Sequence, residues 1–333
     1  VEQGMIRGLA RATTACRAGM LVVASAGVLG CPRKSDGPAP APSASVSLPA
    51  PVASGVPLDP KTLSDAVNPD GKATYAGPSG TIEGRVVATG DAPVEQPQIA
   101  QQIPDNCRAA RSFYAKPFRE GEGRALADVL VSVIGYHEYI PAKEPAQRFV
   151  AKDCTFETRT IALTLGQRIE VVSGDREAYV PELIGGDRGT AQIVATPGGK
   201  VASTLYPTKP GRYVLIDNLR LFMTAEVYVL KYATVDVTGI DGRYRITGLP
   251  PGDLTLSAFL PSTGATVTRA VKIEADKTTT LDVEIAFDAA AHAAKQRGDA
   301  GAPLDAGSVP SSTPSASAPK TKAPPKPAVS AKP

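Results

Sequence analysis

The sequence predicts an all-β protein in which two β-sandwiches lie between disordered N- and C-terminal tails. Short apolar runs alternate with polar residues from Gly80 to Phe287, and turns containing Gly and Pro separate these runs. No segment with helical periodicity interrupts them, and the prolines of the 333-residue chain gather toward its two ends. About 210 residues, 79–288, therefore remain to fold, which suits two sandwiches of about 100 residues each.

Residues 1–31 have the organisation of a secretory signal peptide. Three arginines precede a short apolar run, and small residues precede Cys31. The apolar run is too short and too interrupted for a membrane-spanning helix. The tetrad Val28-Leu29-Gly30-Cys31 resembles the lipobox of bacterial lipoproteins, which implies that the sulfur of Cys31 carries lipid. Pro32 follows it, rather than the Asp associated with inner-membrane retention, and this favours the outer membrane. A cleaved signal with an incidental Cys31 is the alternative.

Two further segments have too little apolar content to fold. Residues 32–78 are rich in Pro, Ala and Ser and cannot bury enough surface to offset their ordering entropy, so we expect a tether. Residues 289–333 end in a Pro, Ala, Ser and Lys tail that we also expect to be disordered. Its lysines could contact anionic wall polymers or lipid headgroups, or could simply keep the tail soluble. Local helical character is confined to residues 61–67 and the Ala run around His292.

The clearest strand pattern covers residues 235–261. Tyr244 and Ile246 alternate with arginines, residues 248–253 interrupt the alternation, and it resumes at Leu254. Because Pro250 and Pro251 lack amide donors and the following Gly can take a positive φ, neither strand can continue through this corner. The other predicted strands cover residues 80–88, 127–134, 153–156, 160–165, 167–172, 201–205, 212–216, 225–230, 267–273 and 281–287.

Cys107 and Cys154 are the two cysteines of the predicted folded part. An exported protein meets an oxidising environment, so a disulfide between them is expected. Such a bond would close a long loop, which the chain-entropy model values at about 3 to 4 kcal/mol. Two buried free thiols are the alternative.

The composition argues against several functions. The net charge of +3 is small and the basic residues are not interleaved with aromatic ones, so we expect no nucleic-acid partner. Aromatic residues make up 5% of the chain and Trp is absent, which leaves few surfaces on which sugars or bases could stack. His137 and His292 lie far apart in the sequence, without a second His or a Cys nearby. Because no nucleophile, base and orienting group can be placed together, we expect neither an enzyme nor a cofactor.

Residues 238–264, TGIDGRYRITGLPPGDLTLSAFLPSTG, carry a specific motif. They resemble the carboxypeptidase regulatory-like (transthyretin-like) domain, whose pattern is Thr-x-x-Asp-Gly-x-Phe-x-Ile-x-Gly-Leu-Pro-Pro-Gly-x-Tyr-x-Leu. Tyr244 and Leu254 stand at its aromatic positions. The resemblance implies that residues 233–288 form a non-catalytic β-sandwich, of the kind often appended to other domains.

The order of parts across residues 79–288 resembles exported plastocyanin-like proteins, in which a cupredoxin sandwich, here residues 79–232, comes first. That family holds copper with a His after an Asn-x-Asp turn and with a Cys-x-x-His-x-x-Met run. The matching positions are Tyr179, Asp217, Arg220 and Met223, so three of the four ligands are replaced. A blue-copper site needs a thiolate and two imidazoles, which these side chains cannot supply. We therefore expect a cupredoxin-like shell without copper; a periplasmic copper electron-transfer protein is the alternative.

The resulting hypothesis is a non-enzymatic, lipid-anchored envelope protein that acts as a binding or structural module. Its candidate partners are the membrane, through the lipid, and either an envelope polysaccharide or another envelope protein. The loops of cupredoxins converge at the copper end, so the predicted binding surface comprises Tyr179, Glu182, Asp187, Asp217, Arg220 and Phe222. The two sandwiches could follow one another along the chain, or the first two strands could pair with residues 244–287 around an inserted cupredoxin part.

Overall fold

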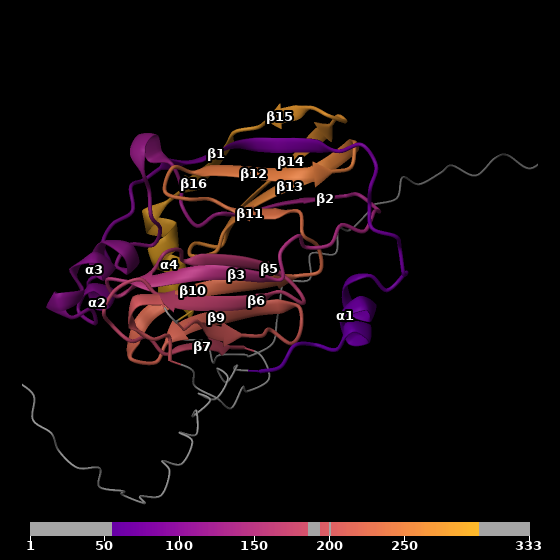
Figure 1. The fold of residues 1–333 in the computed structure, drawn as a ribbon. Coiled ribbons are helices and arrows are strands. Elements are labelled where there is room, and N and C mark those ends of the chain that lie inside the picture. The colour runs from indigo at the N-terminus through magenta and orange to yellow at the C-terminus, as the bar shows by residue number, and fades with distance from the viewer. Residues whose placement is uncertain (1–54, 186–193, 200, 300–333) are drawn as a thin grey trace, which may run out of the picture. The chain divides into compact units, whose positions relative to one another are not determined.

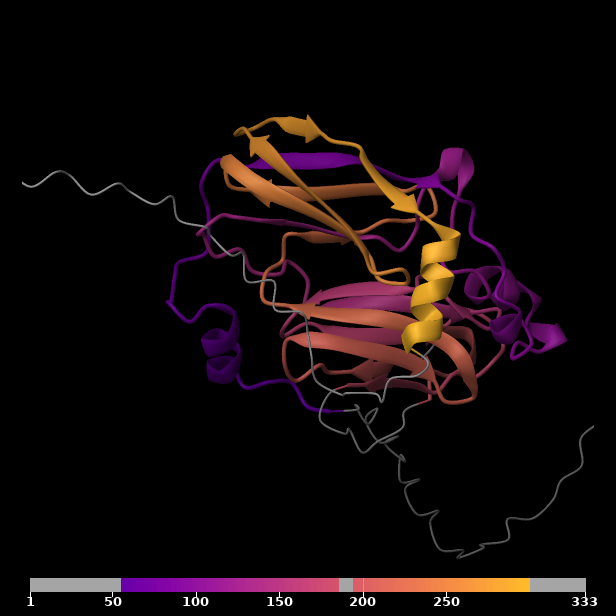
Figure 2. The ribbon, with the colours of Figure 1, turned by 180° about the vertical axis from the view of Figure 1, so that it is seen from behind.

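The computed structural model describes residues 55–185, 194–199 and 201–299. Contacts divide the chain into two units, residues 1–48 and 49–333, and every described residue belongs to the second. Cys31, the signal peptide, Asp187 and the tail beyond residue 299 lie outside the described residues. Strands dominate the described part, so the predicted all-β fold is confirmed (Figures 1 and 2). Within that part, no helix has the length and apolar character needed to cross a bilayer.

One pair of sheets, which we call the outer sandwich, is built from the two ends of the folded part. Its first sheet has the order β12-β1-β15, with β16 also paired to β1, and its second has the order β11-β2-β13-β14. Buried residues of both sheets form one core, including Ile82, Val131 and Leu256. The strands are β1 (Gly80–Gly90), β2 (Leu130–Ile134), β11 (Val235–Val237), β12 (Arg243–Leu249), β13 (Gly252–Leu260), β14 (Ala265–Ile273), β15 (Thr278–Thr280) and β16 (Val283–Phe287).

A second pair of sheets, the inner sandwich, comes from the middle of the chain. Its sheets have the orders β5-β10-β9-β7 and β4-β3-β6-β8. They enclose a separate core that includes Phe156, Leu163 and Val227. The strands are β3 (Ala146–Lys152), β4 (Thr155–Phe156), β5 (Thr160–Thr164), β6 (Arg168–Ser173), β7 (Pro181–Ile184), β8 (Ser203–Leu205), β9 (Gly211–Asp217) and β10 (Arg220–Leu230).

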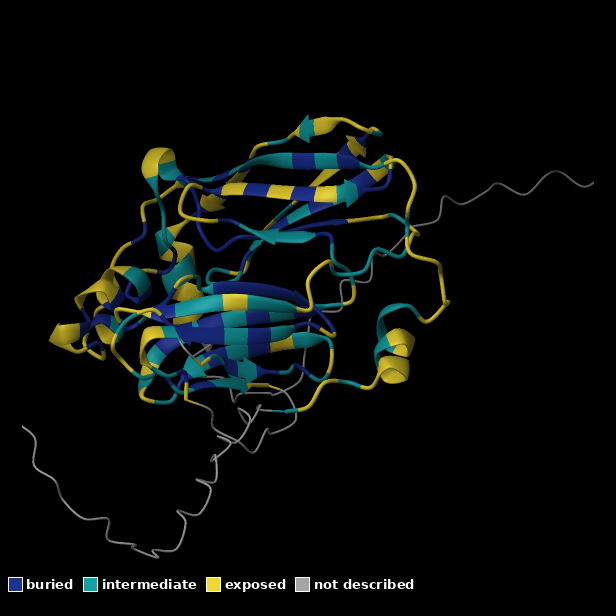
Figure 3. Ribbon diagram, in the orientation of Figure 1, coloured by how far each residue is buried: buried dark blue, intermediate teal, exposed yellow. Residues whose placement is uncertain are grey.

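The strand pairing is nested rather than sequential. β1 pairs antiparallel with β12, placing Ile82 opposite Ile246, and β2 pairs antiparallel with β13. A domain boundary at residue 232 would therefore separate β1 and β2 from their partner strands, and the predicted division into residues 79–232 and 233–288 is corrected accordingly. Alternating burial along a strand shows which face is inside, as β12 illustrates in Figure 3, but it does not specify the neighbouring strand.

The corner between β12 and β13 follows the sequence pattern. β12 ends at Leu249 and β13 begins at Gly252, so Pro250 and Pro251 lie between the strands. Gly252 has a φ of +151°, a conformation that other residues rarely adopt. The prediction that neither strand continues through this corner is confirmed.

Short helices accompany the strands, and two of them fall in segments where the sequence predicts no helix. α2 (Pro97–Ala100) packs Ile99 against the inner core, and α3 (Arg108–Tyr114) adds Ala110 and Tyr114 to it. Helices this short are marginal alone, so tertiary contacts must hold them. α1 (Pro60–Val67) contributes Leu63 to the same core, and α4 (Ala289–Asp299) follows β16. The predicted tether, residues 32–78, and tail, residues 289–333, thus both contain folded residues.

One buried carboxylate joins the two sandwiches. Asp128, just before β2, accepts two hydrogen bonds from the Arg119 guanidinium at 2.6 and 2.7 Å. It also accepts the hydroxyl of Thr158 at 3.0 Å and the backbone amide of Arg159 at 2.8 Å, both from the connection between β4 and β5. Its own amide donates to the carbonyl of Thr238, just after β11. Asp128 therefore contacts strand connections of both sandwiches, and we call this group the Asp128 cluster.

A disulfide joins Cys107 to Cys154, with 5.5 Å between their Cα atoms. It ties the start of α3 to the turn between β3 and β4. Next to it, the Tyr114 hydroxyl accepts a hydrogen bond from the amide of Phe156 at 3.1 Å. The bond therefore fastens the short helices onto the inner sandwich.

Replacing Cys107 and Cys154 together by Ala should lower the free energy of unfolding by about 3 to 4 kcal/mol. The reason is that the two residues are 47 positions apart, and without the disulfide the unfolded chain gains conformational entropy. Urea denaturation of the two proteins measures the difference. The reducing agent dithiothreitol should destabilise the wild type and leave the double variant unchanged. Equal stabilities of the oxidised wild type and the variant would contradict this account.

Candidate functional site

Three of the four positions that match the copper ligands of the cupredoxin pattern, Tyr179, Asp217 and Arg220, lie together at one end of the inner sandwich. Asp217 ends β9 and Arg220 begins β10, so the two flank the turn between these strands. The Arg220 guanidinium carbon lies 4.7 Å from the centre of the Tyr179 ring. Tyr179 and Met223 belong to the inner core and are fully buried. Tyr179, Asp217 and Arg220 therefore form one cluster, whose side chains differ from those of a copper site.

Arg220 supplies the positive charge of this cluster. Its guanidinium donates to Asp217 at 3.2 Å, to the carbonyl of Ala178 at 3.1 Å and to Glu177 at 3.1 Å. The Asp217 side chain is 0% exposed and that of Arg220 is 16% exposed. Asp217 also accepts the amide of Val180 at 2.6 Å. Each carboxylate oxygen of Asp217 thus has a partner, as a buried charge requires.

A second network is centred on the Tyr179 hydroxyl. The Tyr179 hydroxyl donates to Asp175 at 2.8 Å, and Asp175 also accepts the amides of Asp153 and Glu177. Burial opposes ionisation of Asp175, but these hydrogen bonds outweigh it and lower its pKa. Burial, and then the hydrogen bond to Asp175, raise the pKa of Tyr179. Asp175 therefore stays ionised and Tyr179 stays protonated, which suits a structural hydrogen bond rather than proton transfer.

The donor set does not fit copper. A blue-copper centre requires a thiolate and two imidazoles, whereas this cluster offers a phenol, a carboxylate, a guanidinium and a thioether. Cys107 and Cys154 are joined to each other, and His137 and His292 lie after β2 and in α4. Across residues 55–185, 194–199 and 201–299, no three His, Cys, Asp or Glu side chains are grouped as metal ligands would be.

The predicted binding surface needs correction. Tyr179 and Asp217 are both 0% exposed, so they support the surface from within and cannot contact a partner. Glu182 is partly exposed and accepts a hydrogen bond from the Asn218 amide at 2.7 Å. Phe222 is also partly exposed and packs edge-on against the Tyr114 ring. Of the six predicted residues, Glu182, Phe222 and the edge of Arg220 remain accessible, while Asp187 lies outside the described residues.

Sequence reasoning missed the most exposed residues of this end. Leu219 and Leu221 stand on either side of Arg220 and are 60% and 68% exposed. The sequence does contain a signal for this surface. Polar residues usually occupy tight turns, whereas here Leu219 and Leu221 lie one and three residues after Asn218. We call Asn218 to Leu221, at the junction of β9 and β10, the hairpin tip.

Adding Cu(II) to the purified protein should give no intense thiolate-to-copper absorption band, because the Tyr179 cluster contains no thiolate and Arg220 repels a cation there. Visible spectroscopy and metal analysis after desalting measure this. A matched sample of the Arg220→Ala variant should also lack the band, since removing the guanidinium restores no sulfur ligand. Stoichiometric copper with a strong visible band in the wild type would refute the assignment.

No protein-family model matches this chain. A search of curated proteins likewise finds no match. The resemblance of residues 238–264 to the carboxypeptidase regulatory-like domain therefore stays a prediction.

Solved structures that match part of the chain include forms of amicyanin. A reduced Cu(I) form of an amicyanin mutant is 19% identical and covers 26% of this chain and 85% of its own, with a TM-score of 0.22. Amicyanin from Paracoccus versutus (Thiobacillus versutus) is 15% identical and covers 30% of this chain and 96% of its own, also with a TM-score of 0.22. At these TM-scores the likeness decides neither the fold nor the function of this chain.

Proposed function

We propose that this chain is a non-enzymatic binding module of the bacterial cell envelope, anchored by lipid on Cys31, and that the hairpin tip contacts its partner. The observation that carries the proposal is the exposure of Leu219 and Leu221 on either side of a largely buried Arg220 that three acceptors hold in place. A rigid support beneath exposed apolar side chains reduces the entropy that binding would cost. We further propose that the inner sandwich is a degenerate cupredoxin and that the outer one is carboxypeptidase regulatory-like.

The chemistry of the cluster favours binding over catalysis. Arg220 is engaged by three acceptors, and the oxygens of Asp217 have partners of their own. The raised pKa of Tyr179 disfavours its use as a nucleophile or base near neutral pH. These groups hold the hairpin tip in place, so the proposal assigns them a supporting role.

The accessible side chains favour a protein partner. Leu219 and Leu221 are aliphatic and exposed. Their neighbours in the sequence bind carboxylates, because Asn218 donates to Glu182 and Arg220 donates to Glu177. Protein interfaces combine an apolar centre with a polar rim in this way. Polysaccharide recognition would instead use exposed aromatic rings, and the nearby Phe222 ring packs against Tyr114. We therefore propose another envelope protein rather than an envelope polysaccharide.

The proposed location rests on the lipobox resemblance. The disulfide between Cys107 and Cys154 is compatible with an oxidising compartment, which is where such bonds persist. Pro32 after the lipobox favours the outer membrane. A bacterial cell that expresses the full chain is therefore the setting in which anchor and hairpin tip are tested together.

The test cross-links intact envelopes that contain the wild type or the Leu219→Ser/Leu221→Ser variant. A matched control replaces Val56 and Val94, which are 76% and 68% exposed and lie elsewhere, by Ser. The wild type and the control should cross-link to the same envelope protein, and the hairpin-tip variant should lose that product. Circular dichroism should show equal folding of all three, because each change is at the surface.

Three outcomes would count against the proposal. If the hairpin-tip variant cross-links as well as the wild type, the hairpin tip is not the binding surface. If digestion of the wall polysaccharide abolishes the cross-linked product, the ligand is a sugar rather than a protein. A Cys31→Ser variant should leave the membrane fraction, so its retention there would overturn the lipid anchor.

A further inference from the structure

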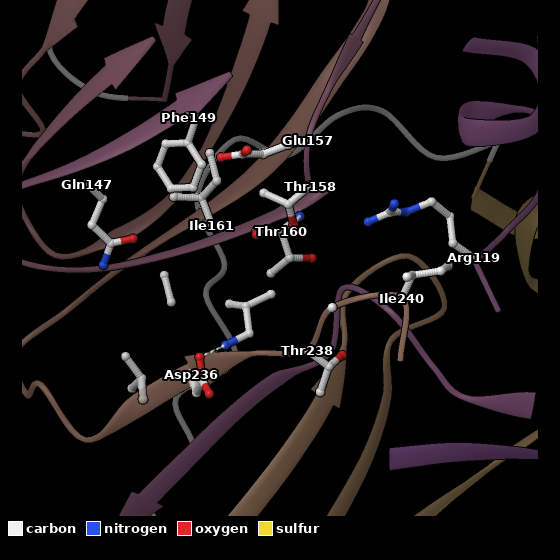
Figure 4. Close-up of a pocket in the computed structure, with 14 residues that line it drawn as sticks. Arg119, Gln147, Phe149, Glu157, Thr158, Thr160, Ile161, Asp236, Thr238 and Ile240 are labelled. Atoms are coloured by element: carbon white, nitrogen blue, oxygen red, sulfur yellow. Dashed lines mark hydrogen bonds between the residues drawn. The ribbon is translucent and has the colours of Figure 1, made fainter. Parts of the chain in front are cut away.

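A cleft of about 430 Å³ lies between the inner and outer sandwiches, away from the hairpin tip. On the inner side it is lined by Gln147 and Phe149 of β3, by Glu157 and by Ile161 of β5 (Figure 4). On the outer side β11 contributes Asp236, followed by Thr238. The volume lies within the range of small-molecule sites, which occur preferentially where two domains meet. The cleft is therefore large enough for a ligand and is framed by both sandwiches.

Each sandwich supplies the cleft with one carboxylate that lacks a cationic partner. Glu157 forms no ion pair with any residue in the described part of the chain. Asp236 accepts only backbone amides among those residues, from Val237 at 2.8 Å and Arg245 at 2.7 Å. Partial burial raises the pKa of both carboxyl groups, although the Glu157 side chain is exposed at the mouth of the cleft and Asp236 is half-buried.

The one basic residue among those lining the cleft is already neutralised. Arg119 forms the bidentate pair with Asp128 at 2.6 and 2.7 Å, and its guanidinium also lies 4.1 Å from the centre of the Phe113 ring. Its charge is therefore directed into the Asp128 cluster and away from Glu157. The cleft consequently carries uncompensated negative charge, which favours a cationic ligand.

The remaining lining indicates what kind of cation fits. Phe149, Ile161 and Val235 provide apolar surface, and Thr160 and Thr238 provide hydroxyl groups. Figure 4 shows Phe149, Glu157 and Ile161 on one side of the cleft and Asp236 and Thr238 on the other. A metal ion would need several converging oxygen ligands, and the described residues contain no group of three acidic or other ligating side chains. An ammonium on an apolar body can pair with a carboxylate and also pack against an aromatic face.

We propose that this cleft binds a small aliphatic amine in its protonated form. Its ammonium pairs with Glu157, and its hydrocarbon chain packs against Phe149 and Ile161 and extends toward Asp236. A second amine at the far end of the ligand would meet Asp236. This site is independent of the hairpin tip, so its existence does not depend on the partner proposed for Leu219 and Leu221.

The test is isothermal titration of the full-length protein with 1,5-diaminopentane, at low and at physiological salt. The neutral analogue 1,5-pentanediol has the same chain and serves as the ligand control. The diamine should bind saturably, the diol should not, and added salt should weaken the diamine. Glu157→Gln should weaken binding at least about tenfold, because a charge-assisted hydrogen bond to the ligand is lost. Glu284→Gln, at an exposed carboxylate on β16, should bind like the wild type.

A second variant tests the cleft without removing Glu157. Gln147→Arg places a cation within the lining, so it should compete with the diamine and weaken its binding while the thermal midpoint stays near that of the wild type. Absence of saturable diamine binding by the wild type would overturn the proposal. So would equal affinity for the diol, or equal losses in the Glu157→Gln and Glu284→Gln variants.

Discussion

The pairing of Asp128 with Arg119 is the interaction on which the nested fold depends. The Asp128 side chain is 6% exposed, and it binds the guanidinium, a hydroxyl and a backbone amide together. A buried carboxylate is stable only if a cation and hydrogen-bond donors surround it. The segments that carry these donors must therefore lie next to one another in the folded protein. They come from the segment before β2 and from the connection between β4 and β5. The Asp128 cluster therefore fixes the inner sandwich against the outer one, together with the edge-on contact between the Tyr228 and Phe259 rings.

Two carboxylate environments of the inner sandwich explain its two proposed surfaces. At the hairpin tip, Arg220 donates a hydrogen bond to the buried carboxylate of Asp217. The exposed leucines are therefore the side chains there that a partner could contact. At the cleft, Arg119 is committed to Asp128, and Glu157 is left without a cation. The buried charge of Asp217 is thus compensated within the protein, whereas the exposed carboxylate of Glu157 is available to the proposed ligand.

Local patterns predicted the local structure of this chain well. Alternation located most of the strands but missed β3 and β7, and the Pro250-Pro251 corner separated β12 from β13. Tyr179, Asp217 and Arg220, far apart in the sequence, lie close together. The sequence could not reveal which strands pair. The alternation of apolar and polar residues in β1 shows which face of the strand is buried, but it would be the same beside any neighbouring strand. It also concealed α2 and α3, whose stability comes from tertiary contacts, and the cleft, whose walls lie far apart in the chain.

Hydrogen exchange of the Asp128→Asn variant tests most directly whether the Asp128 cluster couples the two sandwiches. Asn keeps the size of the side chain and tolerates the φ of 65° at this position, but it leaves Arg119 without its counter-ion. Breaking a buried pair costs about 3 to 5 kcal/mol, so amide protection should fall together in β2 and β5. Glu226→Gln, which removes the exposed pair with Arg212, should change neither strand. Loss of protection confined to one sandwich would contradict the account.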